Sequence, residues 1–139
     1  MNTISNPYEL RSGVPDVDTF RRLRTGAGMS DRPAAAVAAG LPNTWYGVTV
    51  HHEGRTVGMG RVVGDGGSVF QIVDVCVLPE HQGRGLGRRI MARLTAELES
   101  RAPAGAYVSL IADGPAHHLY AQYGFTPTAP RSAGMHRLV

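Results

Sequence analysis

The sequence predicts an α/β fold in which a mixed, mainly antiparallel central sheet is flanked by helices. Between residues 45 and 78, three apolar segments follow one another with short breaks, as consecutive antiparallel strands do. Leu86, Ile90, Leu94 and Leu98 then recur every fourth residue, which is typical of a helix with one apolar face. Another apolar segment and a second helical pattern follow, so the predicted sheet also gains a strand after a helical crossover.

The size and composition of the chain fit one globular domain over residues 1–139. Hydrophobic residues make up 42% of the sequence and charged residues 18%, which is neither a disordered nor a fibrous composition. A chain of 139 residues is long enough for one sizeable core and too short for two typical domains.

Two short helices are expected near the N-terminus, at residues 17–28 and 31–41. Asp18 is the predicted N-cap of the first, and Asp31 that of the second, with Pro33 in its opening turn. Because both patterns come before the strand-like segments, we expect both helices to precede the sheet.

Three strands are expected at residues 45–52, 56–63 and 68–78, because their apolar segments are bounded by turn-forming residues. Gly64–Gly67 reads most simply as a hairpin turn. The alternative is that Asp65, at the edge of the sheet, meets a cationic substrate.

The second half of the chain continues the alternation of helices and strands. After a helix at residues 86–101, we expect a strand at 106–113 and a short helix at 114–123. Residues 125–128 and 134–139 form a candidate final strand pair. The alanine-rich helix at 31–41 is positioned to border a substrate pocket.

The charge and the cysteine content indicate an intracellular protein. All of the positive charge comes from arginine, and the formal net charge is +3, which is a weak signal for nucleic-acid binding. Cys76, the single cysteine, lies in an apolar segment and is expected to be buried. We find no apolar run of about 18 residues and no basic-then-apolar leader, so we expect a cytoplasmic location without membrane contact.

Residues 82–88 form a glycine-rich segment between the third strand and the long helix. Backbone amides without partners at a helix start, together with the helix dipole, bind anions, and glycine lets an anion approach those amides closely. Four arginines surround the segment: Arg84, Arg88, Arg89 and Arg93. A Walker A loop is excluded because the chain has no lysine.

Two motifs give the segment a family resemblance. Gln82, Gly85 and Gly87 form Q-x-x-G-x-G directly after a strand, and residues 119–125 read LYAQYGF. Both resemble signatures of the GNAT N-acetyltransferase superfamily, and the resemblance extends from Trp45 to the C-terminus. It implies the GNAT fold and an N-acetyltransferase activity.

The resemblance also implies acetyl-CoA as the cofactor and a set of residues that bind it. Val75 and Val77 would pair with the pantetheine arm, and Gln82 belongs to the binding motif. The pyrophosphate would bind the backbone of the glycine-rich segment, namely Gly83, Arg84, Gly85, Leu86, Gly87 and Arg88.

Tyr120 occupies the tyrosine position of the family and is the expected general acid, because a phenol stays protonated at neutral pH. A backbone amide near Val77 is the expected oxyanion donor, if the strands splay there. At Gln71 and Val73, where relatives carry a base, neither residue titrates. Asp74 is the only acid on the strand, and either serves as the base or amine-orienting group or has a structural hydrogen-bonding role. A bulge is needed to turn it toward the site.

Other polar residues carry less specific signals. Asp113 stands where many relatives carry an asparagine that touches pantetheine, so that contact is in doubt. His51 and His52 point to opposite faces of a strand, and His117 and His118 diverge on a helix. We therefore expect no metal site, although the second pair is also a candidate lining of the acceptor side of the pocket.

The sequence thus predicts an enzyme that transfers an acetyl group directly from acetyl-CoA to a primary amine of a small molecule. Three alternatives remain open: a non-catalytic acetyl-CoA-binding or interaction module, a protein N-acetyltransferase, and a nucleic-acid-binding domain. Many members of the family form dimers, so a homodimer is one expected assembly.

Overall fold

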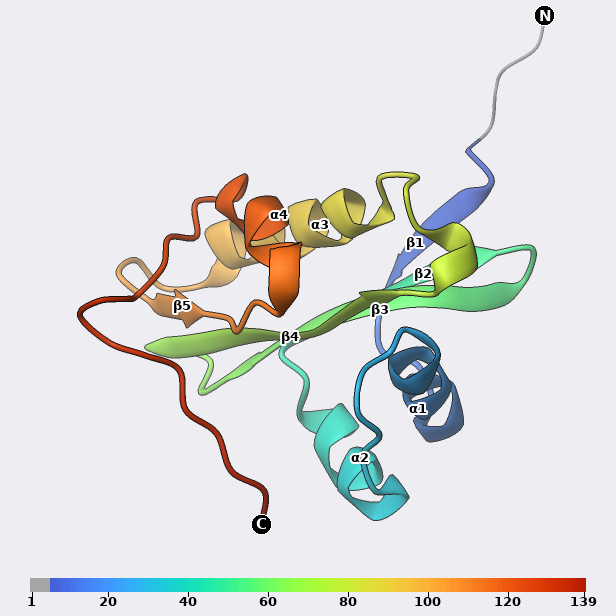
Figure 1. The fold of residues 1–139 in the computed structure, drawn as a ribbon, viewed down its shortest axis with the longest axis horizontal. Coiled ribbons are helices and arrows are strands. Elements are labelled where there is room, and N and C mark those ends of the chain that lie inside the picture. The colour runs from blue at the N-terminus through green and yellow to red at the C-terminus, as the bar shows by residue number, and fades with distance from the viewer. Residues whose placement is uncertain (1–5) are drawn as a thin grey trace, which may run out of the picture.

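A computed structural model describes residues 6–139 as a five-stranded sheet with helices on both faces (Figure 1). Helices α3 and α4 cover one face, and α1 and α2 lie on the other. The strands are β1 (Tyr8–Ser12), β2 (Tyr46–His52), β3 (Arg55–Gly64), β4 (Val69–Val77) and β5 (Tyr107–Ser109). The helices are α1 (Val17–Gly26), α2 (Ala34–Gly40), α3 (Leu86–Arg101) and α4 (His117–Ala121).

The sheet is mixed and mainly antiparallel, as the sequence predicted. Its strands follow the chain order β1-β2-β3-β4-β5. Neighbours from β1 to β4 pair antiparallel, whereas β5 pairs with β4 in parallel after the α3 crossover. The three strands predicted between residues 45 and 78 are present as β2, β3 and β4.

The prediction that both early helices precede the sheet was wrong, because β1 comes first. β1 is short, and only Tyr8 on it is fully buried. Its partner strand β2 decides its conformation: Tyr8 lies opposite His52, and Ser12 lies opposite Val48. A strand of five residues that depends on a partner so distant in sequence leaves little periodic signal.

The helix caps also differ from the prediction. Asp16, not Asp18, caps α1, because its Oδ1 accepts a hydrogen bond of 2.7 Å from the Thr19 amide. Asp31 does not cap α2, which begins after Pro33 without a side-chain cap. The Asp31 carboxylate instead binds the Arg21 guanidinium through two hydrogen bonds.

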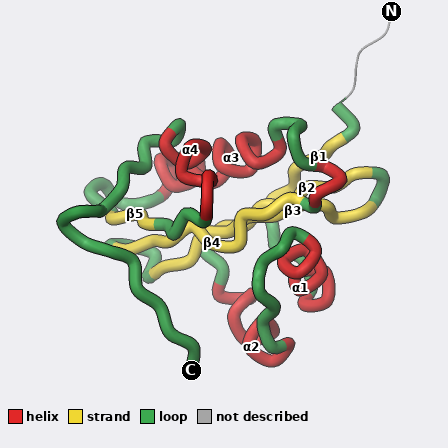
Figure 2. The backbone as a smooth tube through the Cα atoms, in the orientation of Figure 1, coloured by secondary structure: helices red, strands yellow, loops and turns green. Residues whose placement is uncertain are grey.

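The C-terminal part of the chain contains less strand than predicted. The segment 106–113 forms only the three-residue β5, and 114–123 contains a 3₁₀ turn followed by α4. The predicted final pair was wrong: residues 125–139 form no strand and run along the outside of the molecule (Figure 2). Pro127 and Pro130 lack the amide that a sheet ladder requires.

The main core lies between α3 and the sheet. Leu86, Ile90, Leu94 and Leu98 are all buried, as their spacing predicted. Burying each of these side chains contributes about 1.5–3 kcal/mol. The core therefore holds α3 firmly against the sheet, and the glycine-rich segment lies at the N-terminal end of this helix.

The turn between β3 and β4 is built around Asp65, which supports the hairpin alternative. Its Oδ1 accepts hydrogen bonds from the amides of Gly67, Ser68 and Val69. Its Oδ2 accepts one from the Ser68 hydroxyl at 2.6 Å. These bonds, that of the Ser68 hydroxyl first, hold the pKa of Asp65 well below its ordinary value.

We expect Asp65→Ala to lower the melting temperature at pH 7. A lowered pKa in the folded state stabilises the fold fully above the ordinary aspartate pKa of 3.8. Below that pH the contribution declines, so the difference between the variant and the wild type should shrink on acidification. Thermal melts from pH 7 down to pH 3 measure it, and a difference that grew toward acid pH would contradict this account of the turn.

Candidate functional site

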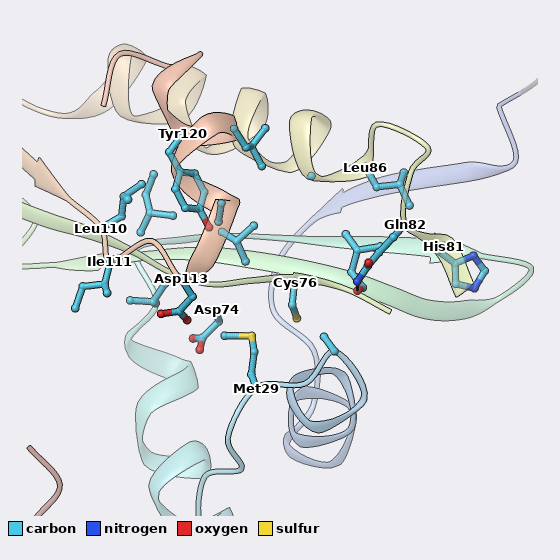
Figure 3. A pocket seen from close by; sticks show the side chains of 18 of the residues that line it. Met29, Asp74, Cys76, His81, Gln82, Leu86, Leu110, Ile111, Asp113 and Tyr120 are labelled. Carbon is cyan, nitrogen blue, oxygen red and sulfur yellow. Dashed lines mark hydrogen bonds between the residues drawn. The ribbon is translucent and has the colours of Figure 1, made fainter. Parts of the chain in front are cut away.

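A pocket of about 480 Å³ opens where β4 and β5 part (Figure 3). The two strands pair only as far as Gln71 opposite Ser109, so the rest of β4 has no strand neighbour on that side. The pocket is lined by β4 from Ile72 to Val77, by the segment from His81 to Gly87, and by residues of the α1–α2 loop, the loop after β5 and α4.

The free edge of β4 presents backbone groups to this pocket. The Leu78 amide donates to the Val57 carbonyl on β3, and backbone groups alternate in direction along a strand. Val77 and Val75 therefore face the parted edge. The Val77 carbonyl accepts a hydrogen bond of 2.9 Å from Gln82 Nε2, which fixes the loop that leads into the glycine-rich segment.

The glycine-rich segment ends in an open cradle of amides. Gly83 and Gly85 have φ values of +75° and +78°, which side chains other than glycine rarely adopt. Gly85 is the N-cap of α3 and offers no side chain to its amides. Within residues 6–139, the amides of residues 83–88 donate to no acceptor. Several amide donors thus meet the positive end of a 16-residue helix.

Tyr120 lies in the same pocket. Its ring descends from α4 into the space above β4, with Asp113 and Asp74 below it in the view of Figure 3. Burial, followed by the nearby charge of Asp113, raises the pKa of Tyr120 above its ordinary value. The phenol is therefore a proton donor that stays protonated over the whole neutral range.

Asp113 is a pocket residue whose importance the sequence did not show. It follows β5 and faces the same pocket as Tyr120. Its carboxylate makes no hydrogen bond within the described part of the chain. Asp113 is exposed, and a carboxylate without a partner at the edge of a pocket attracts a cation.

The Cys76 thiol is unsuited to nucleophilic attack. It is buried, as the sequence predicted, and burial raises its pKa to about 12. Because the thiolate is the reactive form, Cys76 stays inert at neutral pH.

Asp74 reaches the pocket through the bulge that the sequence required. Two steps along β3, from Met59 to Arg61, correspond to three along β4, so β4 carries an extra residue. Asp74 itself has a φ of +60°. The bulge turns its carboxylate toward the helices α1 and α2.

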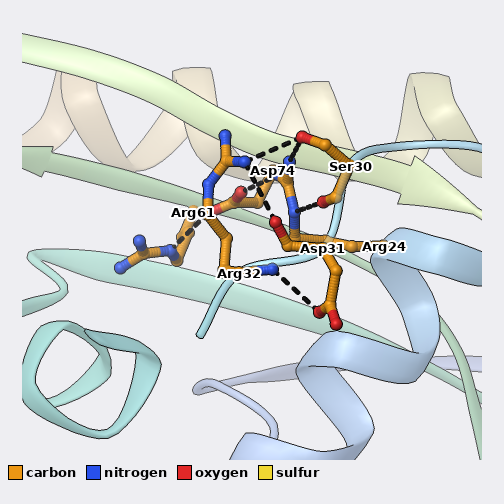
Figure 4. A network of polar contacts seen from close by, with 6 residues as sticks. All are labelled: Arg24, Ser30, Asp31, Arg32, Arg61 and Asp74. Atoms are coloured by element: carbon orange, nitrogen blue, oxygen red, sulfur yellow. Dashed lines mark hydrogen bonds and ion pairs between the residues drawn. The ribbon is translucent and has the colours of Figure 1, made fainter. Parts of the chain in front are cut away.

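Both carboxylate oxygens of Asp74 bind arginine (Figure 4). Arg24 Nη1 lies 2.6 Å from Oδ1, and Arg61 Nε lies 2.7 Å from Oδ2. The Asp74 and Arg24 side chains are only 9% and 5% exposed. This geometry favours the structural alternative for Asp74, because both of its carboxylate oxygens are already bound to guanidinium groups.

The histidine pairs do not converge on the pocket. His117 and His118 are exposed, and neither lines it. His52 stacks against Tyr8 with ring centroids 4.7 Å apart, and His51 Nε2 lies 2.8 Å from the Thr49 hydroxyl. Within residues 6–139, no three His, Cys, Asp or Glu side chains are grouped to hold a metal ion.

A comparison with known families identifies the fold and the chemistry. Residues 44–127 match the family model described as an acetyltransferase (GNAT) domain. The chain belongs to the GNAT acetyltransferase family. This confirms the resemblance to the GNAT superfamily, the GNAT fold and the assignment as an N-acetyltransferase.

Solved structures and curated sequences agree on the GNAT family. A probable acetyltransferase from methicillin-resistant Staphylococcus aureus superposes with a TM-score of 0.91 at 42% identity, covering 95% of this chain and 99% of that one. A chloroplastic GCN5-related N-acetyltransferase from Arabidopsis thaliana is 29% identical over 88% of this chain and 55% of its own length. A chloroplastic serotonin N-acetyltransferase from rice is 43% identical over 62% of this chain and 34% of its own length.

This GNAT chain spans about half the length of the first curated relatives that it matches. GNAT enzymes use acetyl-CoA as co-substrate, which the family implies for this chain. Among residues 6–139, no helix combines the length and apolarity needed to cross a membrane.

Proposed function

We propose that this chain transfers an acetyl group from acetyl-CoA directly to the primary amine of a small molecule. The observation that carries the proposal is that one pocket joins an amide cradle, a free strand edge and a half-buried phenol. The amide cradle and the free edge of β4 would hold acetyl-CoA. The phenol of Tyr120 would lie beside the departing thiolate. The relative from rice is named a serotonin N-acetyltransferase, which supports an amine of small size.

The residues of the pocket fit coenzyme A in their chemistry. The free amides of residues 83–88 are suited to a pyrophosphate, and a Cβ built on Gly85 would meet no protein atom within 4 Å, so space for a ligand is open there. Arg84 and Arg88 are exposed at the cradle and would offset phosphate charge. Val75 would pair with the pantetheine amides, and Val77 would lie next to the acyl end of the arm. Bound acetyl-CoA supplies an activated thioester acyl group.

Three groups of the chain would then carry the transfer. The Val77 amide would donate to the developing oxyanion. Tyr120 would donate a proton to the departing thiolate. Asp113, in place of Asp74, would hold the acceptor ammonium and receive its proton, because its carboxylate is not bound to arginine as that of Asp74 is. Asp74 would act as a positioning residue that holds Arg24 and Arg61 under the acceptor side.

Direct transfer is proposed in place of an acetyl-cysteine intermediate. Cys76 lines the pocket, but its pKa of about 12 leaves a negligible thiolate fraction at neutral pH. The amine of the acceptor would therefore attack the thioester itself.

We expect Gly85→Ala to weaken acetyl-CoA binding at least tenfold, because a methyl group there occupies the approach to the amides. Gly54→Ala is a matched control. Gly54 has a φ of +77° and equally open surroundings, but lies in the β2–β3 turn. Isothermal titration with acetyl-CoA measures both variants. Equal affinities for the two would contradict the cradle.

A thiol-release assay over an amine panel tests the proposed reaction. We expect turnover with small primary amines, whereas acetyl-CoA binding without turnover would indicate a non-catalytic module. A relative from Glycine max is named a histone acetyltransferase, so a histone peptide belongs in the panel. Turnover of that peptide alone would indicate a protein N-acetyltransferase. Binding to DNA without affinity for acetyl-CoA would indicate the nucleic-acid alternative.

We further propose that residues 1–139 act as a single acetyltransferase domain. A homodimer and a cytoplasmic location stay predictions from the sequence. Two of the relatives are named chloroplastic. Size-exclusion chromatography with light scattering measures the assembly.

A further inference from the structure

A second, smaller cavity of about 130 Å³ lies between α1, α2 and the sheet. Phe20 and residues of α2 and the turn after it form its apolar wall, and Arg32 and Arg61 form its polar side. Asp74 lines both this cavity and the main pocket. The two cavities therefore adjoin at Asp74.

The surroundings of this cavity carry an excess of positive charge (Figure 4). Arg24 and Arg61 share the single carboxylate of Asp74. Arg32 is a third guanidinium, and the neighbouring carboxylate, that of Asp31, is bound to Arg21. Three arginines thus lie around one available carboxylate, and this excess of positive charge attracts an anion.

The arginines that line the cavity keep donors free. Arg24 uses all three of its nitrogens, on Asp74 and on the carbonyl and hydroxyl of Ser30. Arg61 binds Asp74 through Nε and Thr44 through Nη1. Within residues 6–139, its Nη2 makes no hydrogen bond, and neither do Nε and Nη2 of Arg32. These free donors belong to the guanidinium groups that line the cavity.

The volume and the apolar wall of the cavity indicate which kind of anion it can bind. Guanidinium donors match the two oxygens of a carboxylate, and the apolar wall suits a few carbon atoms beside it. A cavity of about 130 Å³ holds a carboxylate and its neighbouring carbons, but not a polypeptide segment. An anionic group on the acceptor would give the free donors of Arg32 and Arg61 a charged hydrogen-bond partner.

We infer that the acceptor is a small amino acid, whose carboxylate binds Arg32 and Arg61 while its amine lies in the main pocket. The inference rests on the proposed function and names the substrate class of the same site. It follows from the charge and size of the second cavity. The carboxylate would also balance the arginine excess around Asp74.

Pairs of acceptors that differ only at the carboxylate test this inference, because the difference in amine basicity within each pair favours the opposite result. Valine and valinamide differ at the carboxylate alone, and leucine and leucinamide form a second pair. The amides have the less basic amines, so a larger fraction of them is neutral and reactive at pH 7.5. Without carboxylate recognition they would react faster. We expect the opposite, with kcat/KM at least tenfold higher for the acids.

Variants then locate the recognition. Arg32→Gln should bring the ratio of kcat/KM for valine over valinamide close to one, mainly by raising KM for valine. Arg55→Gln removes the same charge from an exposed position in the β2–β3 hairpin, and should leave the ratio unchanged. Circular dichroism melts of both variants show whether each is folded.

The outcomes separate this inference from the proposed function. Turnover with valinamide preferred, or a ratio that Arg32→Gln does not change, would overturn the amino-acid inference and leave the transferase proposal standing. If acetyl-CoA binds but neither the acids, the amides nor any other small amine is acetylated, the proposed function fails and the inference fails with it.

Discussion

Tyr120→Phe is expected to lower kcat by about 10²–10⁴-fold, the usual contribution of a general acid. The affinity for acetyl-CoA should change little, because the cradle at residues 83–88 and the β4 edge are untouched. The variant removes the phenol oxygen from the pocket and keeps the ring that packs there. Stopped-flow or steady-state thiol release measures kcat, and calorimetry measures binding.

Tyr107→Phe is the matched control, because Tyr107 is 59% exposed on β5 and should tolerate the change. The pH dependence of the wild-type rate provides a second test of the role of Tyr120. A proton donor acts while protonated, and the pKa of Tyr120 is raised, so the wild-type rate should fall only above the ordinary tyrosine pKa of about 10. An unchanged kcat in Tyr120→Phe would remove Tyr120 from the mechanism.

Asp74→Ala is expected to destabilise the fold by about 3–5 kcal/mol, because it leaves the buried Arg24 guanidinium without its counter-charge. Arg24 is 4% exposed, so water cannot replace the lost carboxylate. Urea unfolding, followed by circular dichroism, measures the change. Asp74→Asn should lose less stability, since the amide oxygen still accepts a bond and asparagine tolerates the positive φ at this position.

Asp18→Ala serves as the control, since Asp18 is exposed on α1. This substitution should lower the free energy of unfolding by less than about 1 kcal/mol. A positioning role for Asp74 predicts that activity and stability fall together, with the acceptor KM affected more than kcat. An Asp74→Asn variant that is as stable as the wild type but has lost kcat at every pH would instead identify Asp74 as the base.

The positions that the sequence predicted well are those that carry a local pattern. Leu86, Ile90, Leu94 and Leu98 identify α3 because helical spacing repeats within one segment. Gly85 indicates the cradle because a glycine at the start of a helix leaves the first amides open to an anion. By contrast, β1 depends on β2, some forty residues away, and no spacing within β1 records that pairing.

The contacts of the charged residues in the site also depend on tertiary structure and could not be predicted from a local sequence pattern. Arg24 lies 50 residues from Asp74 in the sequence, and its contact exists only because α1 packs under the bulge of β4. Arg61 lies on the neighbouring strand β3, and it reaches Asp74 because the two strands pair beside that bulge. Asp113 was noticed as a departure from the family pattern, but its place beside Tyr120 depends on how the loop after β5 folds back over the pocket.

The sequence by itself determined the family, the main elements of the sheet, the long helix and the position of the amide cradle, because each of these is encoded in residues close together in the chain. The tertiary structure decided which carboxylate is free and which is held by arginines, and where a second cavity adjoins the first. Those features depend on distances between segments far apart in sequence, and the energies of charged groups depend on the burial that only packing creates.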